Sequence, residues 1–259
     1  MRFSVLSSGS KANCTFVEAG ETRILIDCGL SAREAEKRLA SLGIDPGSID
    51  AVIVTHEHTD HINGIPVFSK RHKIPVFANG ATAQFIPGVA VQFFETGEDF
   101  SIGKMLIHPF SIVHDASDPV GFTVNAEGLK FSLAMDLGRV TPLVMHAVSN
   151  SHALVLESNH DRDMLMQCDY PWVLKQRINS THGHLSNETA AGLLSDVMHS
   201  ELLHVILGHL SENSNTPELA LAASQRFLSE RLPLTLAVSS IYSATPLLAV
   251  GESSRNVAA

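Results

Sequence analysis

One hexapeptide, His56-Glu57-His58-Thr59-Asp60-His61, directly follows the apolar stretch 51–55 and contains the residues best suited to chemistry. Neutral imidazole and carboxylate are the ligands that zinc and similar divalent metals accept. Four candidate ligands, His56, His58, Asp60 and His61, can hardly all point at one ion. The spacing therefore predicts two adjacent ions that take further ligands from elsewhere in the chain, and the alternative is a polar loop rich in histidine by chance.

Other apolar segments also end in a residue that can bind a metal. These segments and their terminal residues are 23–26 with Asp27, 106–113 with His114, 131–135 with Asp136 and 204–208 with His209. In α/β sheets, ligands gather beyond the carboxyl ends of strands. We therefore expect these side chains to meet the hexapeptide at one sheet edge, although each alone could be an ordinary capping or surface residue.

Hydrophobic periodicity and turn residues predict alternating strands and helices along the chain. Strands are expected at 2–6, 14–18, 23–27, 51–55, 75–78, 91–94, 105–113, 120–126, 129–135, 153–157, 203–208 and 234–238. Helices are expected at 31–42, from the histidine-rich turn to about 71, and at 140–148, 161–167, 171–178, 187–199 and 217–230. This pattern predicts an α/β layer architecture in one domain, residues 1–250, followed by a loose tail, 251–259.

Composition narrows the class of protein. The chain has 259 residues, of which 44% are hydrophobic and 17% charged, as is typical of a globular protein. No apolar run reaches the roughly 18 residues of a membrane helix, and three widely spaced cysteines favour a reducing cytoplasm. The net charge of −9 argues against broad electrostatic binding to nucleic acid, but bound cations would add positive charge where a phosphate would sit.

The order His-x-His-x-Asp-His, then a His, an Asp and a last His, resembles the metallo-β-lactamase superfamily. Residues 25–29, Leu-Ile-Asp-Cys-Gly, are similar to that superfamily's first motif. The resemblance covers nearly the whole chain and implies a four-layer αββα sandwich with a dinuclear metal centre at one edge. It implies one ion on His56, His58 and His114, a second on Asp60, His61 and His209, a bridging Asp136, and an Asp27 that orients a ligand by hydrogen bonding.

The chemistry of such a centre is hydrolysis. Two divalent ions (zinc or manganese, with iron possible) about 3.5–4 Å apart can share a hydroxide at neutral pH and stabilise a developing oxyanion. Water is then the nucleophile, so that no serine or cysteine nucleophile is required. Asp60 could both bind a metal and orient the hydroxide.

Four further segments resemble one branch, the YycJ/WalJ-type metallo-hydrolases, which are regarded as exonucleases that digest DNA from the 5′ end. These segments are 7–14, 156–161, 183–187 and 208–211. The resemblance implies DNA as the partner and substrate of this chain and a phosphodiesterase acting in the 5′-to-3′ direction as its function.

Two groups of residues are candidates for contact with that substrate. Ser8, Ser10 and Asn13 follow the first strand, where they could donate hydrogen bonds to a phosphate or simply form a turn. His184 lies just before Ser186, a plausible N-cap of the following helix. It could contact a phosphate there or protonate a leaving alkoxide, or it could be a solvated residue beside the helix.

Two other functions stay open at this stage. The same centre would serve a hydrolase of a small ester, thioester, lactone or cyclic phosphodiester, and the net charge of −9 does not favour a polyanion. A redox or metal-sensing role is the third possibility, but no additional flavin-sized segment accompanies the domain. Metal identity, strand preference and oligomeric state are left open by the sequence.

Overall fold

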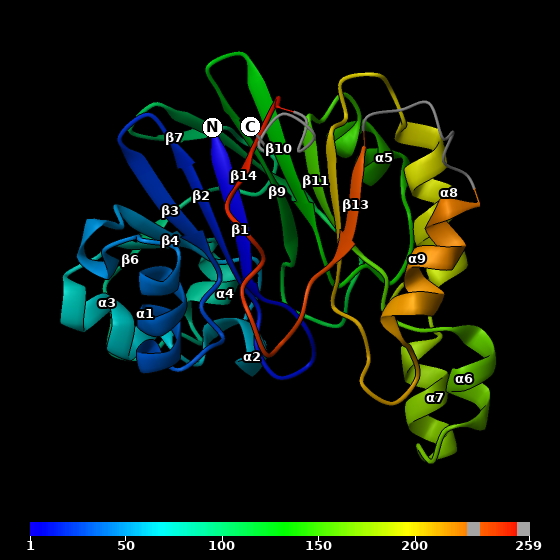
Figure 1. Cartoon of the computed structure of the whole chain (residues 1–259). Helices are drawn as coiled ribbons and strands as arrows, with labels where there is room; N and C mark the ends of the chain where they lie inside the picture. The colour runs from blue at the N-terminus through cyan, green and yellow to red at the C-terminus, as the bar shows by residue number, and fades with distance from the viewer. Residues whose placement is uncertain (227–233, 253–259) are drawn as a thin grey trace.

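The computed structural model describes residues 1–226 and 234–252, which form two facing seven-stranded sheets (Figure 1). In spatial order, the first sheet contains β14 (Leu248–Ala249), β1 (Arg2–Ser7), β2 (Cys14–Ala19), β3 (Thr22–Ile26), β4 (Ala51–Ile53), β5 (Val76–Ala78) and β6 (Val91–Phe93). The second contains β13 (Thr235–Val238), β12 (His204–Gly208), β11 (Ala153–Glu157), β10 (Leu129–Ala134), β9 (Val120–Ala126), β8 (Met105–Ser111) and β7 (Phe100–Ile102).

Helices cover the outer face of each sheet and complete a four-layer αββα sandwich. The first sheet packs against α1 (Ala32–Ser41) and α3 (Ile65–His72), and the second against α5 (Pro142–Val148), α8 (Asn187–Val197) and α9 (Pro217–Gln225). The remaining helical segments are η1 (Pro46–Ser48), α2 (Thr59–Ile62), α4 (Gly80–Ala83), α6 (Arg162–Gln167) and α7 (Trp172–Ile178). The fold expected from the sequence is confirmed. In the described ranges, no helix has the length and apolar character needed to cross a membrane.

Alternation along the strands produces the layers. In β3, Ile24 and Ile26 point between the sheets, while Leu25 points to the helices outside. Successive side chains of a strand face opposite sides of a sheet. A strand that is apolar at every position is therefore buried on both faces, which is why these segments read as continuous hydrophobic runs.

Parallel pairing brings the carboxyl ends of several strands to one edge. The strands β3 to β6 run parallel, as do β10 to β13. Ala134 pairs with Leu156, and Leu156 pairs with Leu207. The residues that follow β10, β11 and β12 consequently emerge at the same level, beside the segment after β4.

A few local expectations differ from the structure. The helix expected to continue to about residue 71 is two helices, α2 and α3, because the Gly64 backbone N–H donates to the Cys28 carbonyl oxygen (2.8 Å) and Pro66, in the first turn of α3, has no N–H to continue the helical hydrogen bonds. The sequence reading also missed β7, β14 and α4. The helix expected at 217–230 is described only to 226, and most of the expected loose tail, 253–259, lies outside the described residues.

Candidate metal centre

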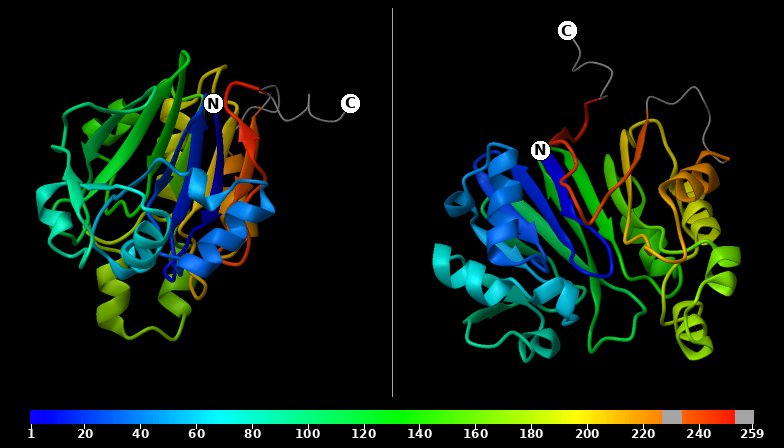
Figure 2. Two further views of the ribbon diagram at one scale, coloured as in Figure 1. Left: turned by 90° about the vertical axis from the view of Figure 1, so that its left-hand side faces the viewer. Right: turned by 60° about the horizontal axis from the view of Figure 1, so that its bottom comes forward.

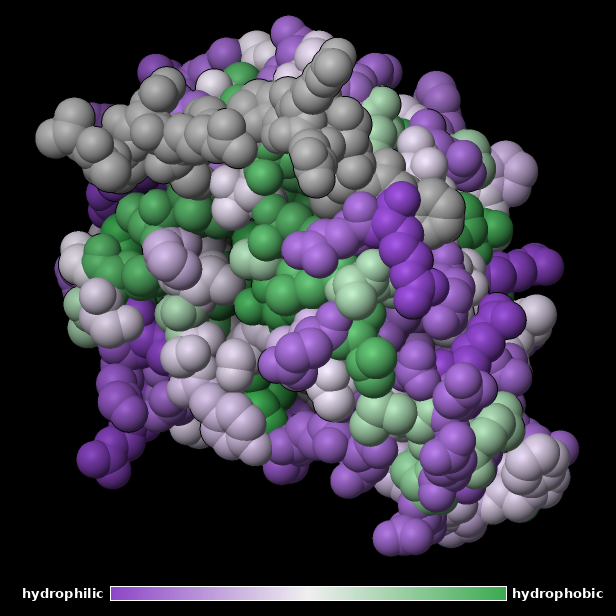
Figure 3. Space-filling view, turned by 45° about the vertical axis from the view of Figure 1, so that its right-hand side comes forward, coloured by the Kyte–Doolittle hydropathy of each residue, from purple (hydrophilic) through white to green (hydrophobic). Residues whose placement is uncertain are grey.

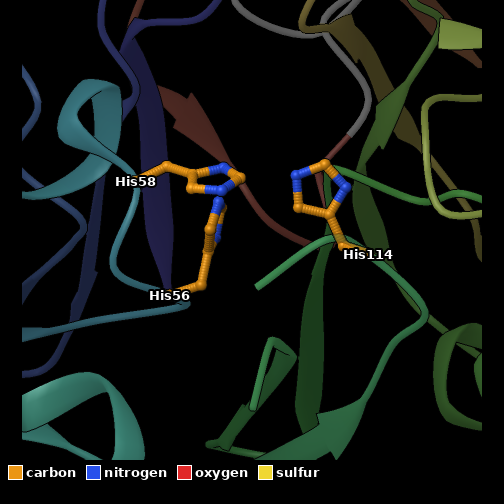
Figure 4. A group of neighbouring side chains, drawn as sticks. All are labelled: His56, His58 and His114. Atoms are coloured by element: carbon orange, nitrogen blue, oxygen red, sulfur yellow. The ribbon is translucent and has the colours of Figure 1, made fainter. Parts of the chain in front are cut away.

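Two groups of donor atoms meet where the two sheets converge. Within each group, the candidate ligand atoms lie within 4.8 Å of one another. The first group is His56, His58 and His114, and the second is Asp60, His61 and His209. Figure 4 shows the rings of His56 and His58, from the chain after β4, facing the ring of His114, from the chain after β8.

Asp136 lies between the two groups. Its Oδ2 is 3.0 Å from Nε2 of His61, and its Oδ1 is 3.4 Å from Nε2 of His209 and 3.8 Å from Nε2 of His114. The structure thus brings together the seven residues that the sequence suggested as metal ligands. Both oxygens thus face the second group, and Oδ1 also lies near His114 of the first, so this carboxylate is within reach of both groups.

The backbone is strained at three of the strand ends. Asp27, Asp136 and His209 have φ angles of 60°, 56° and 55°, in the left-handed region that costs a non-glycine residue of order 1–3 kcal/mol. Gly29 adds a close approach, since a side chain at this position would clash with the Asp60 carbonyl group. The surrounding packing holds these conformations, which turn each side chain from its strand toward the centre.

Asp27 organises the hexapeptide from behind. Its carboxylate accepts hydrogen bonds from the backbone N–H of Thr55 (2.8 Å) and the hydroxyl of Thr55 (2.8 Å), and its Oδ2 lies 2.8 Å from Nδ1 of His61. A carboxylate on Nδ1 fixes the imidazole with Nε2 free to face a metal. This contact matches the orienting role that the resemblance implied for Asp27.

The chemistry of the donors fits a metal centre. Nε2 of His56 and Nε2 of His209 are buried without a hydrogen-bond partner, which is costly for a polar atom unless a ligand satisfies it. His114 is held from its other ring nitrogen, since its Nδ1 lies 3.2 Å from the Gly183 carbonyl oxygen. Burial lowers the pKa of His56 and of His114, and this favours the neutral imidazole that binds metals.

Charge is concentrated in this small volume. Burial opposes ionisation, but the neighbouring carboxylates, Asp136 first, raise the pKa of His209 to about 10, and Asp27 and Asp136 raise that of His61. The nearby imidazoles in turn hold the pKa of Asp60 and of Asp136 well below its usual range despite burial. A bound cation would therefore replace the protons that His61 and His209 otherwise retain.

Glu157, at the end of β11, belongs to the centre although sequence reasoning gave it no role. Its side chain is fully buried, and its Oε1 lies 2.8 Å from Nδ1 of His184 and 3.3 Å from Nδ1 of His209. The backbone N–H groups of Leu137 and Leu185 donate to its Oε2, each at 2.9 Å. Burial raises its pKa, but His184 and His209 outweigh this and hold it at about 2. The sequence feature that indicates this role is the position of Glu157 at the end of the apolar strand β11.

The three candidates after β1 occupy different environments. Ser8 and Asn13 are buried: the Ser8 hydroxyl accepts from the His209 backbone N–H (2.8 Å), and the Asn13 amide donates to Asp60 Oδ2 (2.9 Å). Ser10 is exposed and lines the cavity above the centre. The contacts of Ser8 and Asn13 therefore serve to position the centre, whereas Ser10 is accessible to a substrate.

A cavity of about 290 Å³ opens over the donor groups. His58, Asp60, Asp136 and His209 line its floor, and His184 borders it on the side of Glu157. A further part of the lining comes from α7 and the residues before it. A substrate in this cavity would touch both donor groups at once.

Comparisons with known proteins agree with this picture. Residues 22–206 match the model of the beta-lactamase superfamily domain. Exodeoxyribonuclease YycJ of Bacillus anthracis is 34% identical over 89% of this chain and 90% of its own length, and exodeoxyribonuclease WalJ of Streptococcus pneumoniae is 33% identical over 85% of each. The metallo-beta-lactamase fold protein YhfI of Bacillus subtilis superposes with a TM-score of 0.73 at 14% identity, covering 94% of this chain and 98% of YhfI.

Proposed function

This chain belongs to the metallo-β-lactamase superfamily, and we propose that it is a dinuclear, divalent-metal-dependent exodeoxyribonuclease that digests DNA in the 5′-to-3′ direction. The observation that carries the hydrolytic part is the pair of donor groups joined by Asp136 at the floor of one cavity. The choice of DNA draws on the two exodeoxyribonucleases that match most of the chain.

The proposed ligands are His56, His58 and His114 for one ion and Asp60, His61 and His209 for the other, with Asp136 shared. Two divalent ions in such a centre supply activation of water and neutralisation of charge on a phosphate. Zinc and manganese are both candidates, since imidazole and carboxylate suit either ion and zinc binds more tightly to a given site.

The side chains around the ions supply orientation and proton transfer. Asp60 is held by the Asn13 amide at 2.9 Å, and in this proposal it directs the attacking water toward the phosphorus. His184 borders the cavity and rests against Glu157. An imidazole that is backed by a buried carboxylate can hold a proton and deliver it to the leaving alkoxide.

The proposed location is the cytoplasm. Cys14, Cys28 and Cys168 are all free thiols, and a reducing compartment keeps thiols in this state.

A substrate panel tests the proposed activity against the small-molecule alternative. The metal-loaded protein is assayed on 5′-phosphorylated DNA, on a thioester, on a lactone and on a cyclic phosphodiester, each with zinc and with manganese. We expect nucleotide release from DNA to dominate and Asp136→Ala to abolish it. Turnover of a thioester or lactone with DNA left intact would assign the centre to the other class.

A further inference from the structure

One wall of the cavity is formed by a helical hairpin that projects from the sandwich and adjoins His184, whose backbone N–H donates to the Ile178 carbonyl oxygen (2.9 Å). Figures 1 and 2 show α6 and α7 standing together below the second sheet, and Figure 3 shows a mixed polar and apolar surface over this projection at the lower right. Tyr170, Leu174, Arg177 and Ile178 of this hairpin line the cavity. We call these four residues the α7 wall.

The α7 wall combines apolar and cationic contacts on one face. Leu174 is followed by Arg177 and Ile178 at spacings of three and four, which place all three on the same side of a helix. Tyr170, just before the helix, is partly buried, and its phenol oxygen accepts a hydrogen bond from the Asn213 amide (2.8 Å). Because this bond holds the ring at the cavity, Tyr170 offers a fixed flat surface.

Arg177 is the one lysine or arginine among the cavity-lining residues that the structure describes. Its Nε and Nη2 lie 2.7 Å and 2.6 Å from Oδ2 of Asp115. Oδ1 of the same carboxylate is 3.3 Å from Nε2 of His114. The guanidinium is therefore held beside the first donor group. The side chain is 61% exposed, and because exposed ion pairs contribute little, it can exchange Asp115 for a phosphate at small cost.

We propose that the α7 wall binds a nucleotide that flanks the scissile bond, with Tyr170 stacked on its base and Arg177 on a phosphate of the strand. This inference rests on the proposed function and names the part of the substrate that the cavity recognises. Aromatic rings stack on bases irrespective of sequence, and the planar guanidinium matches the geometry of phosphate. The α7 wall thus fits a nucleic-acid strand, in which the phosphates are identical along the chain and the bases vary.

The test of stacking is binding of 5′-phosphorylated single strands by the metal-loaded protein, measured by fluorescence anisotropy. The strands carry phosphorothioate linkages near the 5′ end to slow cleavage and are either intact or abasic at the first, second or eighth nucleotide. We expect Tyr170→Ala to raise the Kd of the intact strand about tenfold. The same substitution should have no effect on one of the two strands that are abasic at the first or the second position, namely the strand that lacks the stacked base. Tyr170→Phe, which keeps the ring but loses the hydrogen bond from Asn213, should weaken binding less than Tyr170→Ala does.

Tyr242→Ala is the matched control, since this tyrosine is exposed and its hydroxyl likewise bonds one loop residue, Glu212 (2.6 Å). It should change no Kd. An equal loss for Tyr170→Ala on intact and abasic strands would overturn the stacking contact, because the effect would then be independent of any base.

The test of the Arg177 contact is the salt dependence of binding. One phosphate contact to a single strand contributes a slope of about 0.7 in log Kd against log salt. Arg177→Gln should reduce the slope by about that amount. Arg71→Gln, which removes a similar ion pair between Arg71 on α3 and Glu36 on α1, should leave it unchanged. An unchanged slope in Arg177→Gln would refute the phosphate contact.

Binding and cleavage separate this inference from the proposed function. A protein that binds strands with this pattern but releases no nucleotide would refute the nuclease and retain the α7 wall. A protein that cleaves DNA without sensitivity to Tyr170 would refute only the wall. If the cavity binds an apolar thioester and no strand, both proposals fail.

Discussion

Oε1 of the fully buried Glu157 lies 2.8 Å from Nδ1 of His184, an imidazole that borders the cavity. The carboxylate also lies 3.3 Å from Nδ1 of His209. One buried charge therefore supports both a candidate metal ligand and a candidate proton donor, and this arrangement leads to the first prediction.

Glu157→Gln should lower kcat on DNA by about 10- to 100-fold, as is typical when a partner of a metal ligand is changed. The amide keeps the shape of the side chain but removes the negative charge 2.8 Å from Nδ1 of His184. The measurement is kcat together with metal content. His184→Ala should lower kcat while retaining both ions, and Glu188→Gln, an exposed position on α8, should behave as wild type. Unchanged kcat in Glu157→Gln would count against its role in proton transfer.

Asp27→Asn should weaken one ion more than the other. Asparagine tolerates the left-handed backbone at this position, so the change mainly removes the charge 2.8 Å from His61. We expect about 10- to 100-fold weaker affinity for one of two ions in a metal titration. The control is Asp50→Asn, which removes a charge that also accepts a backbone hydrogen bond, from Arg23 at 2.8 Å. Equal weakening of both ions would show that Asp27 acts on the whole fold.

Ser10 and Asn13 should respond differently to substitution although they lie in the same loop. Ser10→Ala removes an exposed hydroxyl at the cavity and should raise KM for DNA a few-fold with no change in metal content. Asn13→Ala removes the hydrogen bond to Asp60 and should lower metal affinity and kcat together. The two readouts are steady-state kinetics and bound metal per chain. Loss of metal in Ser10→Ala would contradict the division of roles.

His160 should contribute to acid sensitivity. Both of its ring nitrogens are buried without a hydrogen-bond partner, and burial lowers its pKa to about 4, from an ordinary value of about 6.5. Between these pH values the unfolded chain binds a proton that the folded chain does not, so stability falls as pH decreases through this window.

His160→Leu tests this contribution. At pH 7 the variant should match the wild-type free energy of unfolding within about 1 kcal/mol or exceed it, because it removes an unsatisfied polar group. Between pH 7 and pH 5, chemical denaturation should show a smaller loss of stability in the variant than in the wild type. An identical pH dependence of both proteins would refute the assignment.

Patterns of strand and turn were sufficient to predict an α/β layer architecture and the edge where the ligands meet, whereas the four-layer αββα sandwich followed from the family resemblance. Each of Asp27, Asp136 and His209 follows an apolar run, and the common edge of parallel strands then brings them together. The same rule applied to 153–157 would have identified Glu157. A lone glutamate after a strand is common at protein surfaces, so its position alone does not mark it as buried.

Contacts between distant segments were beyond the reach of sequence patterns. The burial of Asn13 against Asp60 and the pairing of Arg177 with Asp115 depend on how loops pack after the sheets form. Spacing along the chain carries no information on such contacts. For this reason the sequence treated Ser8 and Asn13 together with Ser10.

The most direct test of the central claim is digestion of DNA that carries a label at the 5′ end or at the 3′ end, by protein loaded with zinc or with manganese. The account predicts that the 5′ label is released at once as a short product, that the 3′ label shortens progressively, and that Asp136→Ala releases neither. Release that begins at the 3′ end, a ladder of internal cuts, or full activity of Asp136→Ala would contradict it.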